Sequence, residues 1–265
     1  MGEALYKCLV RQGDRGITMN HRVFALAALT AAALAMPALA GEPRAVIELF
    51  TSQGCSSCPA ADKLLGELRS DPSLVVLSLP VDYWDYLGWK DTLALHGHTV
   101  RQQAYAQARG DREVYTPQAV VNGVAHALGS DKAAIEKAID ETRAKAAPLT
   151  VPVTLRVADG KLTVDVADAA NAGNGSAEIW LCPYAGKIPV TVERGENRGH
   201  ALTYYDVVRR WVKLGDWKGK AQTFTVPVAD VVKGESDIDH VAVLVQREPD
   251  GRPGLMLGAA SASLR

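Results

Sequence analysis

The segment Ala45–Pro59 has the sequence AVIELFTSQGCSSCP, which is the strongest indication of the fold in the first half of the chain. Its first seven residues are almost continuously apolar, which is typical of a strand buried on both faces. Cys55 and Cys58 stand where this strand gives way to an amphipathic helix. Two thiols at this spacing can close a small disulfide and reopen it, and a helix N-terminus stabilises a thiolate through its unpaired N–H groups and dipole. The stretch therefore predicts a strand–turn–helix unit with a redox site at the turn.

Outward from this unit, strand-like and helical patterns alternate up to residue 147. Asn122-Gly123 suits the tight turn of a hairpin because both residues tolerate positive φ. The predicted elements are a strand at 45–51, a helix at 59–69, a strand at 74–81, a helix from residue 99, strands at 118–121 and 124–128, and a helix from residue 130. The order is β-α-β-α-β-β-α.

This order, with a Cys-x-x-Cys after the first strand, resembles the thioredoxin fold. Thioredoxin-like proteins place a cis-proline just before the third strand, opposite the dithiol, and Thr116-Pro117 stands at that position. The dipeptide alone fits an ordinary trans-proline ending a loop, because cis X-Pro bonds are uncommon. Its position, the dithiol and the element order together favour the cis bond. We therefore predict an α/β thioredoxin-like domain at 41–147.

From Pro148 the helical pattern largely disappears, and short strand-like runs follow one another, separated by Gly, Asn and Asp. Asp159-Gly160 between two alternating runs is a clear hairpin signal. Strands are predicted at 151–157, 162–166, 177–184, 188–192, 201–212, 221–228, 241–246 and 255–260. The pattern predicts an all-β, sandwich-like antiparallel domain at 148–265.

The first forty residues have the pattern of a targeting segment rather than of a fold. A short basic start precedes an apolar Ala/Leu-rich run, and a small-residue cleavage site ends at Ala40, so Met19–Ala40 is predicted to be a signal peptide. Residues 1–18, including Cys8, are interpreted as an over-extended start upstream of this signal, and the sequence does not decide whether the true start is Met19. The sequence predicts export to a bacterial periplasm or outside the cell; a retained N-terminal anchor is the alternative.

The formal net charge of −1 gives no case for binding nucleic acid or an anionic membrane surface. We expect a protein thiol or disulfide as substrate or redox partner, no cofactor, and no membrane association beyond export. Cys182 lies in a strand-like apolar run. It is interpreted as an inert buried thiol, with a resolving role as the alternative.

The dithiol predicts thiol–disulfide exchange. At a helix start the first cysteine is exposed at the tip and the second is tucked into the first turn, so Cys55 is the attacking thiolate and Cys58 the resolving thiol. The redox direction depends on a reduction potential that the sequence does not give. A structural disulfide or half of a zinc site is the alternative interpretation, with His96, His98 and His126 as possible soft-metal partners or plain surface residues.

Glu48 interrupts the first strand seven residues ahead of Cys55. A buried carboxylate beneath a dithiol can accept the proton of the resolving cysteine, so Glu48 is a candidate catalytic residue. Alternatively, it faces solvent or pairs with a base at the sheet edge.

The segment Val81–Trp89 follows the second strand and is rich in aromatic residues. A strand end next to the dithiol loop is where an α/β sheet presents ligands, so Tyr83 and Trp84, together with Thr116, are predicted to bind substrate. The alternative is that these rings fill the contact between the two domains. The charged loop Arg194–His200 is interpreted as a solvated connection, with ligand contact as a weaker alternative.

Several motifs together resemble a secreted bacterial family that is catalogued as a domain of unknown function and grouped with the thioredoxin-like superfamily. The motifs are Glu48–Pro59, Val81–Asp85, Thr116-Pro117, Gly195–Gly199 and Asp206–Arg209, and the resemblance covers nearly all of 43–262. It implies a fold and an exported location, but no activity.

From the broader thioredoxin pattern, Cys55 carries over as nucleophile, Cys58 as resolving thiol and Pro117 as cis-proline. The chain departs from that pattern: Gly54 replaces a tryptophan, Ser56-Ser57 replaces Gly-Pro, and Glu48 is displaced by one position from the buried aspartate. The leading hypothesis is an exported thiol–disulfide oxidoreductase. A non-enzymatic binding module with a structural disulfide and a copper carrier are the alternatives.

Overall fold

The computed structural model describes residues 42–169 and 177–265. The predicted signal peptide Met19–Ala40 and Cys8 lie outside the described residues. Within the described part, no helix combines the length and apolar character needed to cross a bilayer.

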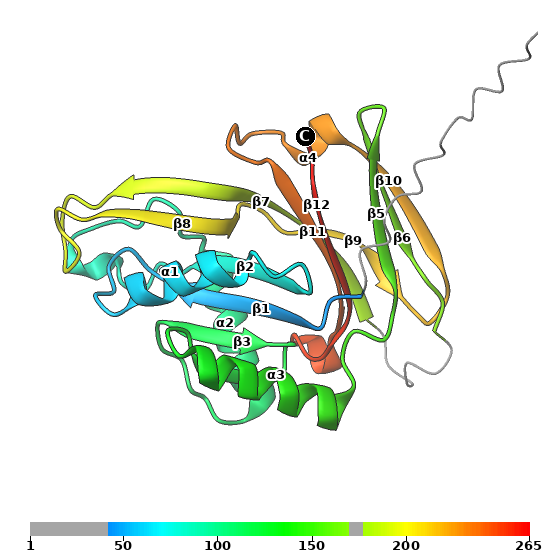
Figure 1. Ribbon diagram of the computed structural model, residues 1–265, viewed down its shortest axis with the longest axis horizontal. Coiled ribbons are helices and arrows are strands. Elements are labelled where there is room, and N and C mark those ends of the chain that lie inside the picture. The colour runs from blue at the N-terminus through cyan, green and yellow to red at the C-terminus, as the bar shows by residue number, and fades with distance from the viewer. Residues whose placement is uncertain (1–41, 170–176) are drawn as a thin grey trace, which may run out of the picture. The chain divides into compact units, whose positions relative to one another are not determined.

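The protein has an α/β architecture in which a mixed sheet with helices is joined to a β-rich part (Figure 1). Up to residue 147 the elements follow the predicted order β-α-β-α-β-β-α, with a short 3-10 turn, η1, after the second strand. They are β1 (Ala45–Thr51), α1 (Cys58–Leu68), β2 (Leu74–Pro80), η1 (Asp85–Leu87), α2 (His96–Arg109), β3 (Gln118–Val121), β4 (Ala125–Leu128) and α3 (Lys132–Ala146).

β1 lies at the centre of this part and every one of its residues is buried. It pairs parallel to β2 and antiparallel to β3, and β4 pairs antiparallel to β3. Because strand side chains alternate between faces, Ile47 and Leu49 pack with the apolar stripes of α1 and α3, whereas Val46 and Phe50 pack with Tyr105 of α2. We call these two sides of β1 the α1 face and the α2 face.

Several of the strands after residue 148 extend the same sheet. Its order is β12-β11-β7-β8-β2-β1-β3-β4, with β9 also paired to β7. The added strands are β7 (Ala177–Thr191), β8 (Ala201–Val208), β9 (Val212–Trp217), β11 (His240–Arg247) and β12 (Met256–Ser263). The 3-10 turn η2 (Pro249–Gly251) lies between β11 and β12. The junction is the parallel pairing of Ser78 in β2 with Val207 in β8. The predicted strands 177–184 and 188–192 are one continuous strand, β7.

A second sheet of three antiparallel strands, β10-β6-β5, completes the β-rich part. Its strands are β5 (Val153–Ala158), β6 (Lys161–Val166) and β10 (Gln222–Pro227), and the short helix α4 (Val228–Val231) follows β10. Leu162 and Val164 pack against Ile179 of β7 and Val243 of β11, so the small sheet shares an apolar core with the large one. The predicted boundary at 147/148 falls directly after α3, and the described residues on both sides of it form one compact unit. The division into two domains stays a prediction.

Candidate functional site

The two cysteines of the opening motif form a disulfide at the start of α1. Cys58 is the first residue of the helix and Cys55 lies in the turn before it, with their Cα atoms 5.4 Å apart. The turn is tight: Cys55 N donates to Ser52 O, and Cys58 N donates to Cys55 O, each at 3.2 Å. Pro59 follows within the first turn of the helix, where its missing N–H costs no hydrogen bond.

Both cysteines are buried, and for Cys55 this corrects the sequence prediction of an exposed tip. Cys55 is 2% exposed and Cys58 is fully buried, although Ser56 and Ser57 between them are exposed. The Sγ atom of Cys55 lies 3.4 Å from the Ser57 hydroxyl. The disulfide is therefore close to the surface but is covered by side chains from other parts of the chain.

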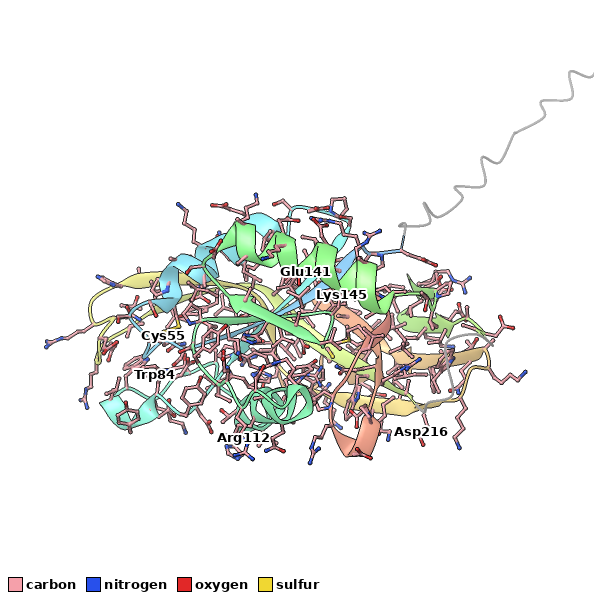
Figure 2. The ribbon with its side chains drawn as sticks, turned by 90° about the horizontal axis from the view of Figure 1, so that it is seen from below. Cys55, Trp84, Arg112, Glu141, Lys145 and Asp216 are labelled. Carbon is pink, nitrogen blue, oxygen red and sulfur yellow. A yellow bond between two sulfur atoms is a disulfide. The ribbon has the colours of Figure 1, made fainter. Side chains whose placement is uncertain are left out.

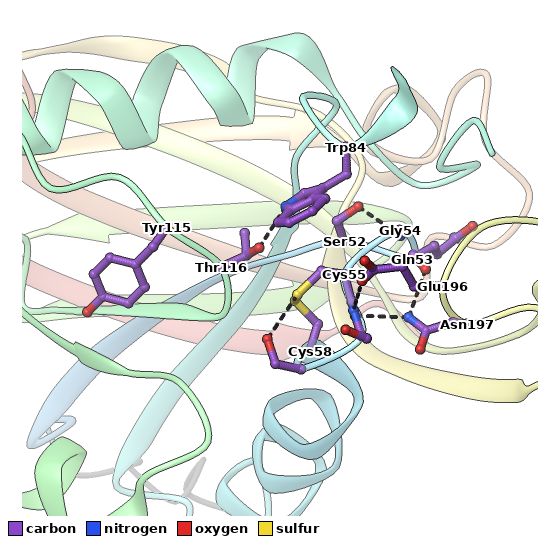
Figure 3. The surroundings of a disulfide bond; sticks show 12 residues. Ser52, Gln53, Gly54, Cys55, Cys58, Trp84, Tyr115, Thr116, Glu196 and Asn197 are labelled. Atoms are coloured by element: carbon purple, nitrogen blue, oxygen red, sulfur yellow. Dashed lines mark hydrogen bonds between the residues drawn. A yellow bond between two sulfur atoms is a disulfide. The ribbon is translucent and has the colours of Figure 1, made fainter. Parts of the chain in front are cut away.

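The disulfide is covered on one side by the loop Arg194–His200, which is therefore not the solvated connection that the sequence predicted. Asn197 Nδ2 donates to the backbone oxygens of Gln53 and Cys55, both at 2.9 Å (Figure 3). The amide of Ser56 donates to the Glu196 carboxylate at 3.1 Å. Asn197 is buried in this position. The loop is thus bound to the backbone on both sides of Cys55.

The other cover comes from the aromatic segment after β2. Figure 3 shows Trp84 and Thr116 beside the Cys55 sulfur, and Trp84 Nε1 donates to Thr116 Oγ1 at 2.8 Å. A Cβ on Gly54 would lie only 2.9 Å from the Trp84 Cβ, so the tryptophan needs a glycine here. The Thr116–Pro117 peptide bond is cis. Two of the three predicted substrate-binding residues thus lie at the disulfide.

Tyr83, the third predicted substrate-binding residue, is partly buried against the α2-face core. Its hydroxyl donates to Gln102 Oε1 of α2 at 3.2 Å, and burial raises the pKa of this phenol to about 12. Tyr86 is instead the exposed ring of the segment, 78% exposed and stacked on Trp84 with 6.4 Å between ring centroids.

The turn that leads into Cys55 is held by a further set of contacts. Gln53 N donates to the Asp91 carboxylate at 2.8 Å, and Trp89 Nε1 donates to Gln53 Oε1 at the same distance. Burial raises the pKa of Asp91, although backbone N–H groups of Gln53 and Leu93 partly oppose the shift. These contacts fix the backbone from which the disulfide projects.

Glu48 lies on the α2 face of β1, not beneath Cys58. Its Oε1 accepts from Arg101 Nε at 2.7 Å and its Oε2 accepts from the Tyr105 hydroxyl. Burial alone would lower the pKa of Arg101, but the Glu48 carboxylate raises that pKa above its usual value. The proposed role as proton acceptor for Cys58 does not fit this placement, because the sheet separates Glu48 from α1.

The Glu48 network also includes residues of the β-rich part. Arg101 donates to Gln246 of β11 at 2.7 Å and lies over the Trp211 ring, 4.3 Å from its centroid. Cys182 of β7 is a free, fully buried thiol in the same core, where burial raises its pKa. Its position supports the interpretation as an inert core residue.

A carboxyl group on the α1 face was not among the predicted site residues. Asp62 is only 4% exposed because it lies on the buried side of α1, and burial raises its pKa to about 8. The signal was present in the sequence, because a residue four positions after Cys58 shares its side of the helix.

The candidate metal-binding histidines are held elsewhere. His96 contacts Asp82 at 2.9 Å, His98 contacts the Pro80 carbonyl at 3.0 Å, and His126 contacts the Tyr115 hydroxyl at 2.9 Å. Across residues 42–169 and 177–265, no group of three or more His, Cys, Asp and Glu side chains has an arrangement that could hold a metal ion.

Residues 46–246 match the family described as "Protein of unknown function (DUF1223)". The chain belongs to this family. None of the curated proteins matches it.

Among solved structures, this DUF1223 chain is similar to the crystal structure of an Agrobacterium tumefaciens protein from a structural genomics consortium. The two share 34% identity with a TM-score of 0.75, over 84% of this chain and 96% of that one. A DUF3823 family protein from Bacteroides ovatus matches at 14% identity and a TM-score of 0.25, over 43% of this chain and 53% of that one.

Proposed function

We propose that this protein is an exported thiol–disulfide oxidoreductase that acts on protein thiols or disulfides in the periplasm. One observation carries the proposal: the Cys55–Cys58 disulfide lies where β1 leads into α1, with Cys58 in the helix and Cys55 under side chains from surface loops. A disulfide in this position can be opened by displacing loops, without unfolding the core.

The arrangement of the first part supports a thioredoxin-like assignment for residues 41–147. The strand order β2-β1-β3-β4, with one parallel and two antiparallel pairings, accompanies the element order that suggested this fold. The matched family carries no activity in its description, so the proposal rests on the site itself.

The reaction is a pair of sulfur exchanges. A substrate thiolate attacks Cys55 Sγ, the Cys55–Cys58 bond breaks, and Cys58 leaves as a thiolate that takes up a proton. A second substrate thiolate then attacks the mixed disulfide and releases Cys55, so the substrate is oxidised and the protein reduced. In the reverse direction, Cys55 attacks a substrate disulfide and Cys58 resolves the intermediate.

Substrate access requires the loop around Glu196 and Asn197 to move. Its contacts to the turn are the hydrogen bonds of Asn197 to Gln53 and Cys55 and that of Ser56 to Glu196. Each such bond contributes about 1 kcal/mol net, so a partner that competes for these groups can open the site at modest cost. The exposed Tyr86 stacked on Trp84 is an adjacent surface for such a partner.

The test is a redox titration of residues 41–265 in glutathione buffers, with insulin reduction as the activity assay. We expect a reversible two-electron transition that is absent from Cys55→Ser and Cys58→Ser. A disulfide that resists glutathione across the accessible range contradicts the proposal.

The low exposure of Cys55 favours a second candidate, a binding module in which the disulfide is structural. In that case Cys55→Ser lowers stability but leaves partner binding intact. The titration separates the two candidates, because only an exchange protein has a potential within the range of the glutathione buffer.

A further inference from the structure

Polar atoms gather without hydrogen bonds of good geometry beneath α1. They come from four elements, α1, β1, β2 and β8, and each is buried among the described residues. The atoms are both carboxyl oxygens of Asp62 and the hydroxyl oxygens of Thr51, Ser78 and Tyr204. Buried polar side chains are usually hydrogen-bonded, so a group of this kind calls for an explanation.

The strand register places these residues on one side of the sheet. Leu49, on the α1 face, is opposite Ser78 of β2, and Thr51 follows Leu49 by two residues and so shares its face. Tyr204 is fully buried, and its pKa is raised first by burial and then by the carboxyls of Asp62 and Asp91. Thr51 and Ser78 therefore lie on the side of the sheet that α1 covers, and Tyr204 lies close enough to Asp62 for the carboxyl to affect its pKa.

Asp62 also lies one helical turn after Cys58. Residues four apart in a helix are neighbours on its surface, and both of these side chains are on the buried side of α1. The Asp62 side chain is thus a neighbour of the resolving cysteine on the side of α1 that is buried against the sheet.

We propose that Asp62 is the proton partner of Cys58, donating a proton to its thiolate when the disulfide opens and accepting that proton when the disulfide closes. The inference rests on the proposed function and adds to it the residue that donates and accepts the proton of Cys58.

Opening and closing of the disulfide each form one S–S bond, break one S–S bond and move one proton. On opening, a substrate thiolate forms a bond to Cys55 Sγ, the Cys55–Cys58 bond breaks, and the Asp62 proton moves to the Cys58 sulfur. On closing, the proton returns to Asp62, the Cys58 sulfur bonds to Cys55 Sγ, and the substrate leaves as a thiolate.

The acidity of Asp62 suits this exchange. Its pKa is raised to about 8, mainly by burial and also by the Asp91 carboxylate, while the nearby Thr51 hydroxyl partly opposes the shift. An ordinary thiol has a pKa of about 8.5, and proton transfer is most efficient between groups of similar pKa near the working pH. Glu48 is not available for this step, because it is paired with Arg101 on the other face.

The groups that face Asp62 define the pH dependence. They are Thr51 on β1, Tyr204 on β8 and Asp91 in the segment after η1. Cys58 lies one turn earlier on the same side of α1, and Ser78 of β2 lies on the same side of the sheet. Below pH about 8 the Asp62 carboxyl holds its proton and the donor is present, whereas above that pH the donor is lost.

The experiment measures how fast dithiothreitol opens the disulfide of residues 41–265 between pH 5 and 10, with each rate divided by the thiolate fraction of the reagent. We expect the corrected rate of the unmodified protein to fall above pH about 8. In Asp62→Asn it should be lower by about tenfold or more at pH 7 and show no such fall. Asp140→Asn, an exposed change on α3, should match the unmodified protein.

Thr51→Val is a second variant that keeps the side-chain volume. Loss of its hydroxyl removes a group that favours ionised Asp62, so the fall in corrected rate should move to higher pH. An unmodified protein with no fall, an Asp62→Asn variant with unchanged rate and profile, or a Thr51→Val profile that does not move overturns the inference. A disulfide that opens at no pH overturns the proposed function instead.

Discussion

A carboxyl group is buried on each face of β1, but among the described residues only one of the two is paired with a cation. On the α2 face, Glu48 is paired with Arg101 and accepts a hydrogen bond from Tyr105. On the α1 face, Asp62 has no cation beside it among the described residues and its pKa is raised. A carboxylate that is fully paired is held in one ionisation state and serves the structure. A carboxyl without such a partner stays near its titration point, which suits proton transfer.

The largest effect is expected from breaking the pair on the α2 face. Arg101→Met leaves Glu48 buried without its cation, and removing one member of a buried ion pair costs about 3–5 kcal/mol of unfolding free energy. Urea denaturation measures this loss.

Lys145→Met is the matched control, because Lys145 pairs with Glu141 on the exposed surface of α3 at 3.3 Å (Figure 2). That change should cost at most about 1 kcal/mol. Equal losses in the two variants would show that the buried pair has no special structural role.

The second effect concerns how the unfolding free energy of the protein depends on pH through Asp62 on the α1 face. The folded-state pKa of Asp62 is about 8 and lies above the ordinary value of 3.8, so the folded protein binds its proton more tightly than the unfolded chain. This contribution to stability is fully present below pH about 4 and is lost as the pH rises to about 8.

Asp62→Asn should remove this dependence, because the amide does not titrate. Relative to the unmodified protein, the variant should gain unfolding free energy between pH 4 and pH 8, by several kcal/mol at most. The measurement is a series of urea denaturation curves across that range. Parallel curves for the two proteins would mean that Asp62 is ionised in the fold, contrary to the contrast between the faces.

A smaller effect is expected at the covered end of α1, where the loop meets the disulfide. Asn197→Ala removes two hydrogen bonds of about 1 kcal/mol each, so glutathione should reduce the disulfide up to about thirtyfold faster. Arg198→Ala, an exposed change in the same loop, is the control and should leave the rate unchanged. Mass spectrometry after thiol alkylation follows the reduction, and equal rates in both variants would show that the loop does not limit access.

The smallest effect is expected for the free thiol on the α2 face. Cys182→Ala should lower the unfolding free energy by about 1 kcal/mol, because it leaves a small cavity in the core. The redox titration should not change. A variant that cannot re-form the Cys55–Cys58 disulfide would instead support the resolving role for Cys182.

The sequence predicted what is encoded locally. The apolar run of β1, the cysteine pair and the apolar spacing of α1 lie within a short segment, so their structures follow from neighbouring residues. The turn at Asn122-Gly123 is also local, and both residues have positive φ as expected. The element order of the first part was predictable for this reason.

The rest depends on contacts between distant parts of the chain. Asn197 contacts Cys55 across 142 positions, and Glu48 meets Arg101 across 53, so neither the cover nor the ion pair is visible in a local pattern. Alternation along β1 could have placed Glu48 on the side of Val46 and Phe50, and helical spacing could have placed Asp62 below Cys58. The pairing of β8 with β2 is likewise non-local, and the prolines and glycine inside β7 made it look like two strands.

The parallel contact of Ser78 with Val207 has a consequence for dissection of the protein. A fragment that stops after Ala147 would lose β8 and present the backbone groups of β2 unshielded to solvent. Unsatisfied strands of this kind recruit other chains and lead to aggregation. The first 147 residues are therefore not expected to stay soluble on their own, because β2 needs β8, which is synthesised after them.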